Sequence, residues 1–273
     1  MDRKSLEKIQ REKLLVAIKR VNKVPFLRQK LREAKPASIN GPADIAKLPF
    51  TYKKDILDCF PFGALAVPLT KVARIHTSSG STNKPITTFY TKSDLRVWSE
   101  LMARGLAGIG AKRGDVFQNT TSQGLFTGGL GLISGAERLG LAVIPLGSAN
   151  PEKQLETMRD FGVSVFHSIP SFGLRMAEVL ESKGKEMRAA LKIRLALCGA
   201  EPWTKEMRRK IEDTLEIDAF NNYGFAEAGG PGIGVECVFK KGLHIWEDHF
   251  MMEVVDPKTG EPLEPEEEGE LVI

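Results

Sequence analysis

The sequence predicts an α/β fold in which parallel βαβ units are followed by a smaller β subdomain. Between residues 116 and 221, short apolar segments typical of buried strands alternate with segments of helical periodicity. Such alternation is typical of parallel strands joined by crossover helices. After residue 231 the helical pattern ends, and short strand-like segments are separated by turns. We therefore expect a helical N-terminal cap at 1–60, an α/β domain at 61–230 and the start of a β subdomain at 231–273.

Amphipathic helices are predicted for the N-terminal cap. Residues 5–21 carry apolar side chains at helical spacing, which predicts one long helix. Val24-Pro25-Phe26 interrupts this pattern, and a second helix is expected at 27–34. Prolines and a glycine within 35–60 predict loops and short helices there.

A polar loop between two predicted strands lies at residues 77–85. Its sequence is Thr-Ser-Ser-Gly-Ser-Thr-Asn-Lys-Pro, and β-branched and aromatic residues predict strands at 72–76 and 86–90. The backbone N–H groups and hydroxyls of such a loop can surround a phosphate chain, and the lysine adds a positive charge. The G-x-x-x-x-G-K spacing of a Walker A loop is absent. Composition alone slightly favours the alternative, which is an ordinary polar hairpin turn.

The central α/β part is predicted element by element. Thr91 and Asp94 have the spacing of a capping box, and Asn150 and Thr204 are expected to cap two further helices. The expected helices cover 91–110, 130–139, 150–162, 171–183 and 204–215. The expected strands cover 116–119, 141–144, 163–166, 193–197 and 217–221. Further strands are expected at 234–239, 243–246 and 250–255, followed by a turn at 256–260.

Two polar segments follow predicted strands of this sheet. Gly199-Ala200-Glu201-Pro202 comes after one strand, and Tyr223-Gly224-Phe225-Ala226-Glu227 comes after another. Ligands of parallel sheets bind beyond the carboxyl ends of the strands. We therefore expect both segments on one rim of the sheet, where they form part of a ligand site.

Composition excludes several classes of function. The net charge of +4, from 39 basic and 35 acidic residues, is too small to indicate nucleic-acid binding. The sequence has no apolar stretch long enough to span a bilayer and no signal-peptide pattern at its start. Its three cysteines are far apart and odd in number, so no disulfide framework is indicated. These features favour a cytoplasmic protein with no membrane partner.

Six ordered segments together resemble the adenylate-forming superfamily and, within it, the phenylacetate–CoA ligase family. They are residues 77–85, 124–131, 135–140, 198–203, 222–227 and 242–250. The resemblance extends from about Val24 to Ile273. It implies that 61–230 is the AMP-binding domain, and that the chain is the large N-terminal domain of the adenylate-forming fold, incomplete at its C-terminus.

The resemblance implies a reaction in two steps. A small-molecule carboxylate reacts with ATP to give acyl-AMP and pyrophosphate, and the thiol of CoA then takes the acyl group. The implied cofactors are ATP, Mg²⁺ and CoA. By resemblance, the phosphates are held by Ser78, Ser79, Gly80, Ser81, Thr82 and Lys84, with Lys84 also catalytic. Asn83 stands where the family usually has glycine, and asparagine tolerates positive φ better than most residues.

The resemblance also assigns the nucleotide side of the site. Glu227 resembles the magnesium ligand and is counted as catalytic, since a hard cation prefers carboxylate oxygen. The adenine side is assigned to Gly199, Ala200, Glu201, Pro202, Tyr223 and Gly224. Structural alternatives are a solvated glutamate for Glu227, a core aromatic residue for Tyr223 and a turn-shaping role for Pro202.

The acyl pocket departs from the phenylacetate pattern. Gln123, Phe126, Gly230 and Pro231 are assigned to it by resemblance. The family has aromatic residues before Gly-Leu-Phe, but here the preceding residues are Thr120-Thr121-Ser122-Gln123. Loss of aromatic walls argues against a simple apolar ring in the same pose. The expected carboxylate is smaller, more polar or of another kind.

The sequence stops at Glu270-Leu271-Val272-Ile273, within a predicted strand. We interpret the chain as truncated, and expect it to be weak or inactive alone, because the family's ribose-binding aspartate and catalytic C-terminal lysine would lie later. A homodimer or a separately encoded C-terminal domain is an expected partner. Alternatives are an adenylating enzyme with an acceptor other than CoA, and a non-catalytic nucleotide-binding remnant or split subunit.

Five cysteine and histidine side chains complete the list of candidates. Some relatives bind zinc through residues that resemble Cys237 and His244 together with two later cysteines. Zinc requires about four ligands, so a structural role is expected for this pair. His76, His167 and His249 have no partner that the sequence identifies, and they are interpreted as structural.

Overall fold

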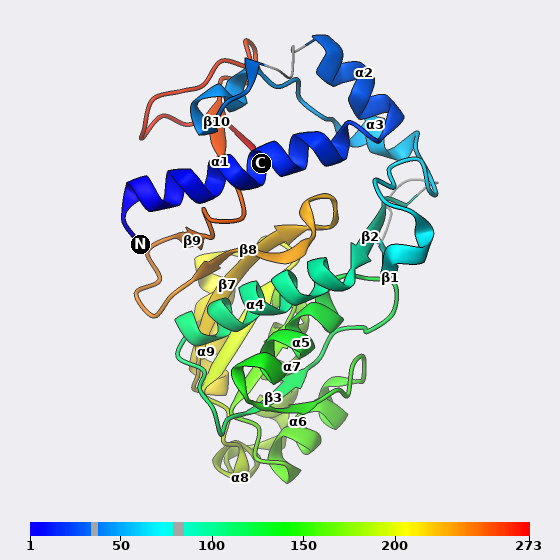
Figure 1. The fold of residues 1–273 in the computed structure, drawn as a ribbon. Helices are drawn as coiled ribbons and strands as arrows, with labels where there is room; N and C mark the ends of the chain where they lie inside the picture. Colours follow the sequence, from blue (N-terminus) through cyan, green and yellow to red (C-terminus); the bar gives the residue numbers. More distant parts are fainter. Residues whose placement is uncertain (34–37, 79–84) are drawn as a thin grey trace. The chain divides into compact units, whose positions relative to one another are not determined.

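The computed structural model describes residues 1–33, 38–78 and 85–273 (Figure 1). The chain forms two compact units. As far as their residues are described, the first comprises Met1–Val72, Gly80–Phe89 and Trp246–Ile273, and the second comprises Ala73–Ser79 and Tyr90–Ile245. These units reflect contacts along the folded chain and not independent folding. The predicted division at residues 60 and 230 therefore stays a prediction.

A seven-stranded sheet forms the centre of the second unit, in the order β4-β3-β5-β6-β7-β8-β9. The parallel strands are β3 (Val116–Asn119), β4 (Ala142–Ile144), β5 (Val165–Ser168), β6 (Leu195–Gly199) and β7 (Asp218–Phe225). The antiparallel strands are β8 (Gly230–Glu236) and β9 (Leu243–Ile245). The predicted α/β fold with parallel βαβ units is confirmed.

Helices cover both faces of this sheet. They are α4 (Lys92–Gly108), α5 (Gly128–Leu139), α6 (Pro151–Asp160), α7 (Pro170–Lys183), α8 (Lys185–Ala190) and α9 (Lys205–Leu215). One core cluster joins α6, α7 and α9 to alternate residues of β5, β6 and β7 such as Phe166, Ala196 and Ala219. The helices α4 and α5 pack against each other and against β8 (Figure 1).

The predicted helix caps are present. The Thr91 hydroxyl accepts the N–H of Asp94, and the Asp94 carboxylate accepts the N–H of Thr91, which completes the capping box. Asn150 accepts the N–H of Lys153, and Thr204 accepts that of Met207. These local signals explain why α4, α6 and α9 begin within a residue of their predicted starts. The short helix α8 was not predicted.

The predicted boundaries of two strands were wrong. β7 runs to Phe225 instead of ending near 221, and β8 covers 230–236 instead of 234–239. The reason is antiparallel pairing of the two strands, which sets Asn222 opposite Val235 and Phe225 opposite Gly230. Tyr223 and Gly224 therefore lie within a strand and not beyond its end.

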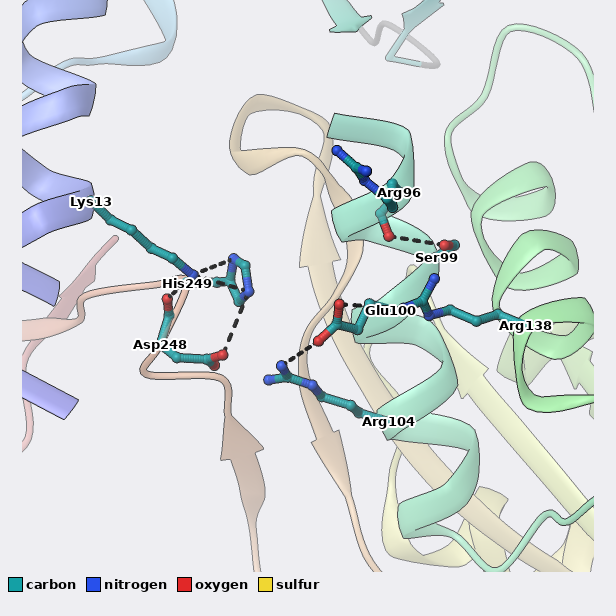
Figure 2. Close-up of polar contacts among 8 residues, drawn as sticks. All are labelled: Lys13, Arg96, Ser99, Glu100, Arg104, Arg138, Asp248 and His249. Atoms are coloured by element: carbon teal, nitrogen blue, oxygen red, sulfur yellow. Dashed lines mark hydrogen bonds and ion pairs between the residues drawn. The ribbon is translucent and has the colours of Figure 1, made fainter. Parts of the chain in front are cut away.

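The first unit is mainly helical. It contains α1 (Arg3–Val21), α2 (Pro25–Glu33), α3 (Lys53–Leu57), the 3-10 turns η2 (Pro42–Lys47) and η3 (Leu69–Lys71), and the paired strands β10 (Glu253–Val255) and β11 (Glu270–Val272). Side chains of α1 hold the start of the last segment. Gln10 donates to the Glu247 carbonyl, and Lys13 donates to the Asp248 carbonyl at 2.6 Å and lies 3.2–3.3 Å from both ring nitrogens of His249 (Figure 2).

Strands β1 (Val72–Thr77) and β2 (Thr87–Thr91) precede and follow the polar loop, as predicted.

In the second unit, Glu100 of α4 accepts from Arg104 at 2.6 Å and pairs with Arg138 of α5 at 3.5 Å (Figure 2). Among the described helices, none is long and apolar enough to cross a membrane.

Candidate functional site

The phosphate loop is described only at its first residue. Ser78 is half-buried directly after β1. Ser79, Gly80, Ser81, Thr82 and Lys84, which are predicted to hold phosphates, lie outside the described residues. Their assignment stays a prediction from the sequence.

The end of β6 packs closely against β7, and Gly199 is the last residue of the strand instead of lying beyond it as predicted. Gly199 lies opposite Asn222, and a Cβ built on Gly199 would stand 2.3 Å from the Asn222 carbonyl oxygen. Ala200 has φ of +74°, a left-handed conformation that is uncommon for a residue with a side chain. Strained backbone of this kind is concentrated at binding and catalytic sites. Gly199 and Ala200 therefore form a tightly fixed backbone ledge at the carboxyl edge of the sheet.

Glu201 has a contact that the sequence did not indicate. Its carboxylate accepts the N–H of Ser171, in the first turn of α7. A carboxylate at a helix N-terminus satisfies a free N–H group and interacts favourably with the helix dipole. The side chain of Glu201 thus fastens the ledge to α7, while Pro202 beside it is exposed.

Asn222 is a site residue that the sequence analysis missed. It is 4% exposed, and its Oδ1 is buried without a hydrogen-bond donor among the residues that the structure describes. A buried acceptor without a donor is costly and needs an explanation. The next residue along β7, Tyr223, is 36% exposed. Its ring makes an edge-to-face contact with the ring of Phe225, with 6.1 Å between the ring centroids. No sequence signal separated Asn222 from an ordinary polar residue in a strand.

Glu227 lies in the short 3-10 turn η4 (Ala226–Ala228), directly after β7. Its side chain is half-buried. Within the described ranges, no hydrogen bond or ion pair engages its carboxylate. This carboxylate is therefore available to a cation or a hydrogen-bond donor from outside the chain.

Gly224, Gly230 and Pro231 meet where β7 pairs with β8. A Cβ on Gly224 would lie 2.3 Å from the Gly230 carbonyl oxygen, and one on Gly230 would lie 2.8 Å from Cζ2 of Trp98. The Trp98 indole N–H donates to the Pro231 carbonyl at 3.0 Å. The structure thus brings three predicted site residues together and adds Trp98, which the sequence analysis did not select.

The loop after β3 carries the other predicted acyl-pocket residues. Gln123 donates through Nε2 to the Pro145 carbonyl at 2.7 Å. The Phe126 ring packs on Gly128, where a Cβ would stand 2.5 Å from Cε1 of the ring. A Cβ on Gly230 would meet Cβ of Thr127 at 3.2 Å, so this loop ends beside the start of β8. Phe126 therefore directly precedes Thr127, the residue that lies beside Gly230. The Gln123 amide instead points to the Pro145 carbonyl.

Two buried histidines that were interpreted as structural both hold this loop. His76 Nδ1 lies 3.0 Å from the Leu125 carbonyl oxygen, and His167 Nδ1 lies 3.0 Å from Asn119 Oδ1. Burial lowers the pKa of His167 to about 3. Burial also lowers the pKa of His76, against the opposing effect of its hydrogen bond to Leu125. Both rings are therefore neutral at neutral pH.

The carboxyl edge of the sheet combines close backbone approach at Gly199, an exposed aromatic ring at Tyr223 and, within the described ranges, an unengaged carboxylate at Glu227. Among the described residues, no group of three or more His, Cys, Asp and Glu side chains is arranged to hold a metal ion. Cys237 and His244 accordingly form no metal site with described neighbours.

Comparison with known proteins identifies the family and the fold. The family model described as AMP-binding enzyme matches residues 7–273. Phenylacetate-coenzyme A ligase of Thermus thermophilus is 44% identical over 100% of the chain, and that of Pseudomonas putida is 43% identical over 98%. The chain spans 62% of the length of each. A structure of 2-hydroxyisobutyryl-CoA ligase with 2-HIB-AMP and CoA has a TM-score of 0.88 at 22% identity, covering 97% of this chain and 58% of that one.

Proposed function

Because the chain belongs to the AMP-binding enzyme family, we propose that the whole protein activates a small carboxylate with ATP and transfers the acyl group to CoA. The observation that carries the proposal is the ledge at Gly199 and Ala200, which lies against Asn222 at the carboxyl edge of β6 and β7. The chain spans 62% of the length of these relatives, so this activity is proposed for the whole protein.

The nucleotide is proposed to bind over this ledge. Asn222 Oδ1 lacks a donor among the described residues, and an amino group of a nucleobase is such a donor. The exposed ring of Tyr223 offers a surface on which a base can stack. Gly199 leaves the backbone open to close approach. Gly224, Ala200, Glu201 and Pro202 complete this side, with Glu201 acting through its contact with α7.

Magnesium is proposed to bind at Glu227. Mg²⁺ is commonly held by one or two carboxylates together with substrate phosphates and water, so a single free carboxylate fits it. The metal would supply charge neutralisation on the phosphates. Ser78 and the adjoining residues up to Lys84 are proposed to hold the phosphate chain, on the resemblance alone.

The reaction proposed for the whole protein is balanced in two steps. A carboxylate oxygen attacks the α-phosphorus of ATP, and the bond to pyrophosphate breaks to give acyl-AMP. The CoA thiol then attacks the acyl carbon, AMP leaves with the bonding electron pair, and the thiol proton is released. Backbone donors fixed before the reaction stabilise the charge that develops at such centres.

The acyl group is proposed to lie between the loop at 123–127 and the start of β8. Phe126, Gly230 and Pro231 supply apolar surface, and Gln123 contributes from the polar part of the loop. The curated relatives are named phenylacetate-coenzyme A ligases. Since Thr120–Gln123 replaces the aromatic residues of that pattern, the proposed substrate is a carboxylate of this class that is smaller or more polar.

Calorimetric titration with ATP and Mg²⁺ tests the nucleotide site. Glu227→Gln keeps the size of the side chain but removes its charge, so we expect the Kd for Mg·ATP to rise about tenfold, which is about 1.4 kcal/mol. Glu186→Gln is the matched control, because Glu186 is an exposed carboxylate on α8. Its Kd should equal that of the wild type.

Two results contradict the proposal. Equal affinity in the wild type and Glu227→Gln would remove Glu227 from the metal site. No Mg·ATP binding by folded wild-type chain would show that these residues do not form the nucleotide site. A cytoplasmic location, and a homodimer or a separately encoded C-terminal domain, stay predictions.

A further inference from the structure

The loop that joins β3 to α5 is anchored at its start by three buried side chains. Asn119 closes β3, Thr121 lies two residues later, and His167 lies in the neighbouring strand β5. All three are at most 9% exposed. Asn119 and Thr121 contact each other locally, two positions apart, whereas the contacts of His167 with them span 46–48 positions and are tertiary.

The hydrogen bonds among Asn119, Thr121 and His167 show which of their contacting atoms donate and which accept. Asn119 Nδ2 donates to the Thr121 carbonyl at 2.8 Å, and a carbonyl can only accept. Asn119 Oδ1 therefore faces the Thr121 hydroxyl at 3.0 Å and His167 Nδ1 at 3.0 Å, and both must donate to it. A neutral imidazole with its proton on Nδ1 meets this requirement. The Thr121 carbonyl thus fixes the Asn119 amide, and the N–H of His167 is the second donor that Asn119 Oδ1 requires in this orientation.

The same histidine also holds the loop through its backbone. The His167 carbonyl accepts the N–H of Thr120 at 3.1 Å and the Thr120 hydroxyl at 2.8 Å. Helix α5 closes the start of the loop from the other side, because a Cβ on Gly129 would stand 2.5 Å from the Ser122 carbonyl oxygen. Thr120 to Ser122 therefore have one well-defined path.

The far end of the loop has a second anchor. The Leu125 carbonyl accepts the N–H of Thr77 at 2.9 Å and lies 3.0 Å from His76 Nδ1. Between the anchors Ser122 and Leu125 are exposed, with Leu125 at 64%, whereas Gln123 is half-buried and donates to the Pro145 carbonyl. The loop is thus held at both ends and by one further contact at Gln123.

We propose that His167 is a positioning residue that, through Asn119 and Thr121, sets the path of the loop Thr120–Phe126 and thereby the carboxylate preference of the site. The part about preference rests on the proposed function. The part about the path of the loop stands without it. A donor at the position of Nδ1 is required, whereas the rest of the imidazole ring serves packing.

Two variants of His167 separate the donor from the ring. His167→Asn places an amide N–H near the position of Nδ1, and His167→Leu fills space but cannot donate. Thr121→Ser and Thr121→Val form a second matched pair, which keeps or removes the hydroxyl that Asn119 accepts. If His167→Leu does not fold, the Thr121 pair decides the question by the same comparison.

The first measurement is amide hydrogen exchange of residues 121–126 in the free protein. We expect His167→Leu and Thr121→Val to exchange at least tenfold faster there, and His167→Asn and Thr121→Ser to stay within threefold of wild type. Faster exchange spread equally over β5 and β6 would indicate a general structural role and would overturn the proposal. Unchanged exchange in His167→Leu and Thr121→Val would do the same.

The second measurement is carboxylate binding by calorimetry in the presence of Mg²⁺ and α,β-methylene ATP, which cannot transfer its adenylyl group to the acid. The probes are phenylacetate and lactate, and the quantity is the ratio of their Kd values. We expect this ratio to change at least fivefold in His167→Leu and to return towards wild type in His167→Asn. A general loss of stability would weaken the binding of both acids by the same factor and leave the ratio of their Kd values unchanged. An unchanged ratio would contradict the proposal that His167 influences the carboxylate preference.

The two measurements fail separately. Wild-type protein that binds neither acid would contradict the proposed function, while the exchange data would still decide whether His167 sets the path of the loop. Wild-type protein that binds both acids, with exchange at 121–126 insensitive to all four variants, would overturn the role of His167 and leave the proposed function standing.

Discussion

At the scale of single residues, Gly199 and Ala200 are neighbours with opposite requirements. Gly199 needs the absence of a side chain, because a Cβ would stand 2.3 Å from the Asn222 carbonyl oxygen. Ala200 already has a side chain in a left-handed conformation with φ of +74°. That conformation costs a residue with a Cβ roughly 1–2 kcal/mol relative to glycine.

Exchanging the two residue types should therefore have unequal effects. We expect Gly199→Ala to lower the free energy of unfolding by about 2 kcal/mol or more, since backbone has to move to make room. Ala200→Gly should stay within about 1 kcal/mol of wild type, because relief of strain offsets the larger entropy of the unfolded chain. Urea unfolding followed by circular dichroism measures both. Equal destabilisation by the two changes would mean that the close contact at Gly199 does not constrain the fold.

At the scale of elements, the capping box of α4 connects a local signal to the site. Thr91 and Asp94 start the helix, and Trp98 one turn later donates to the Pro231 carbonyl. Thr91→Ala removes the hydroxyl that accepts the Asp94 N–H and should cost about 1 kcal/mol of stability. Thr91→Ser keeps the hydroxyl and should cost less than half of that. Thermal unfolding of the pair measures the difference, and a Thr91→Ser as unstable as Thr91→Ala would contradict the role of the hydroxyl.

The elements that the sequence predicted are those with local signals. Caps at Thr91, Asn150 and Thr204 lie within three residues of the N–H groups that they accept, so the sequence contains the whole interaction. The extension of β7 to Phe225 depends on pairing with β8. Within β8, the close approach of Gly230 to Trp98 and of Gly232 to Met102 likewise depends on tertiary packing.

The candidate site was predictable to the same extent. The resemblance selected Gly199, Tyr223 and Glu227, which the structure places along β6, β7 and the turn after it. It gave no role to His76, His167 or Asn222. Their partners are decided by tertiary packing, as in the contact of His167 with Asn119, 48 positions away. A sequence pattern does not show which residues so far apart along the chain are in contact.

At the scale of the whole molecule, the two buried histidines should make stability depend on pH. The folded pKa of His167 is about 3 against an ordinary value of 6.5, and that of His76 is also lowered. The unfolded chain therefore binds protons that the folded chain does not. This contribution to stability is complete above about pH 6.5 and is lost as pH falls below that value.

For His167 the expected slope approaches about 1.4 kcal/mol per pH unit below the unfolded pKa. Urea unfolding of the wild type and of His167→Asn should be compared from pH 7 to pH 5. His167→Asn should lose this part of the slope. Parallel curves would show that His167 is accessible to protons in the folded state.

The close contact of β7, β8 and α4 also bears on how the preference of such a protein can diversify. Gly224, Gly230 and Gly232 lie where an added Cβ would stand 2.3, 2.8 and 1.8 Å from the nearest heavy atom. A side chain added at these three glycines would have almost no space, so few substitutions are tolerated there. At Gly124 the nearest atom, Ser122 Oγ, would be 3.4 Å away. A library designed to redirect the protein to other acids should randomise residues 122–125 and leave 224–232 as they are.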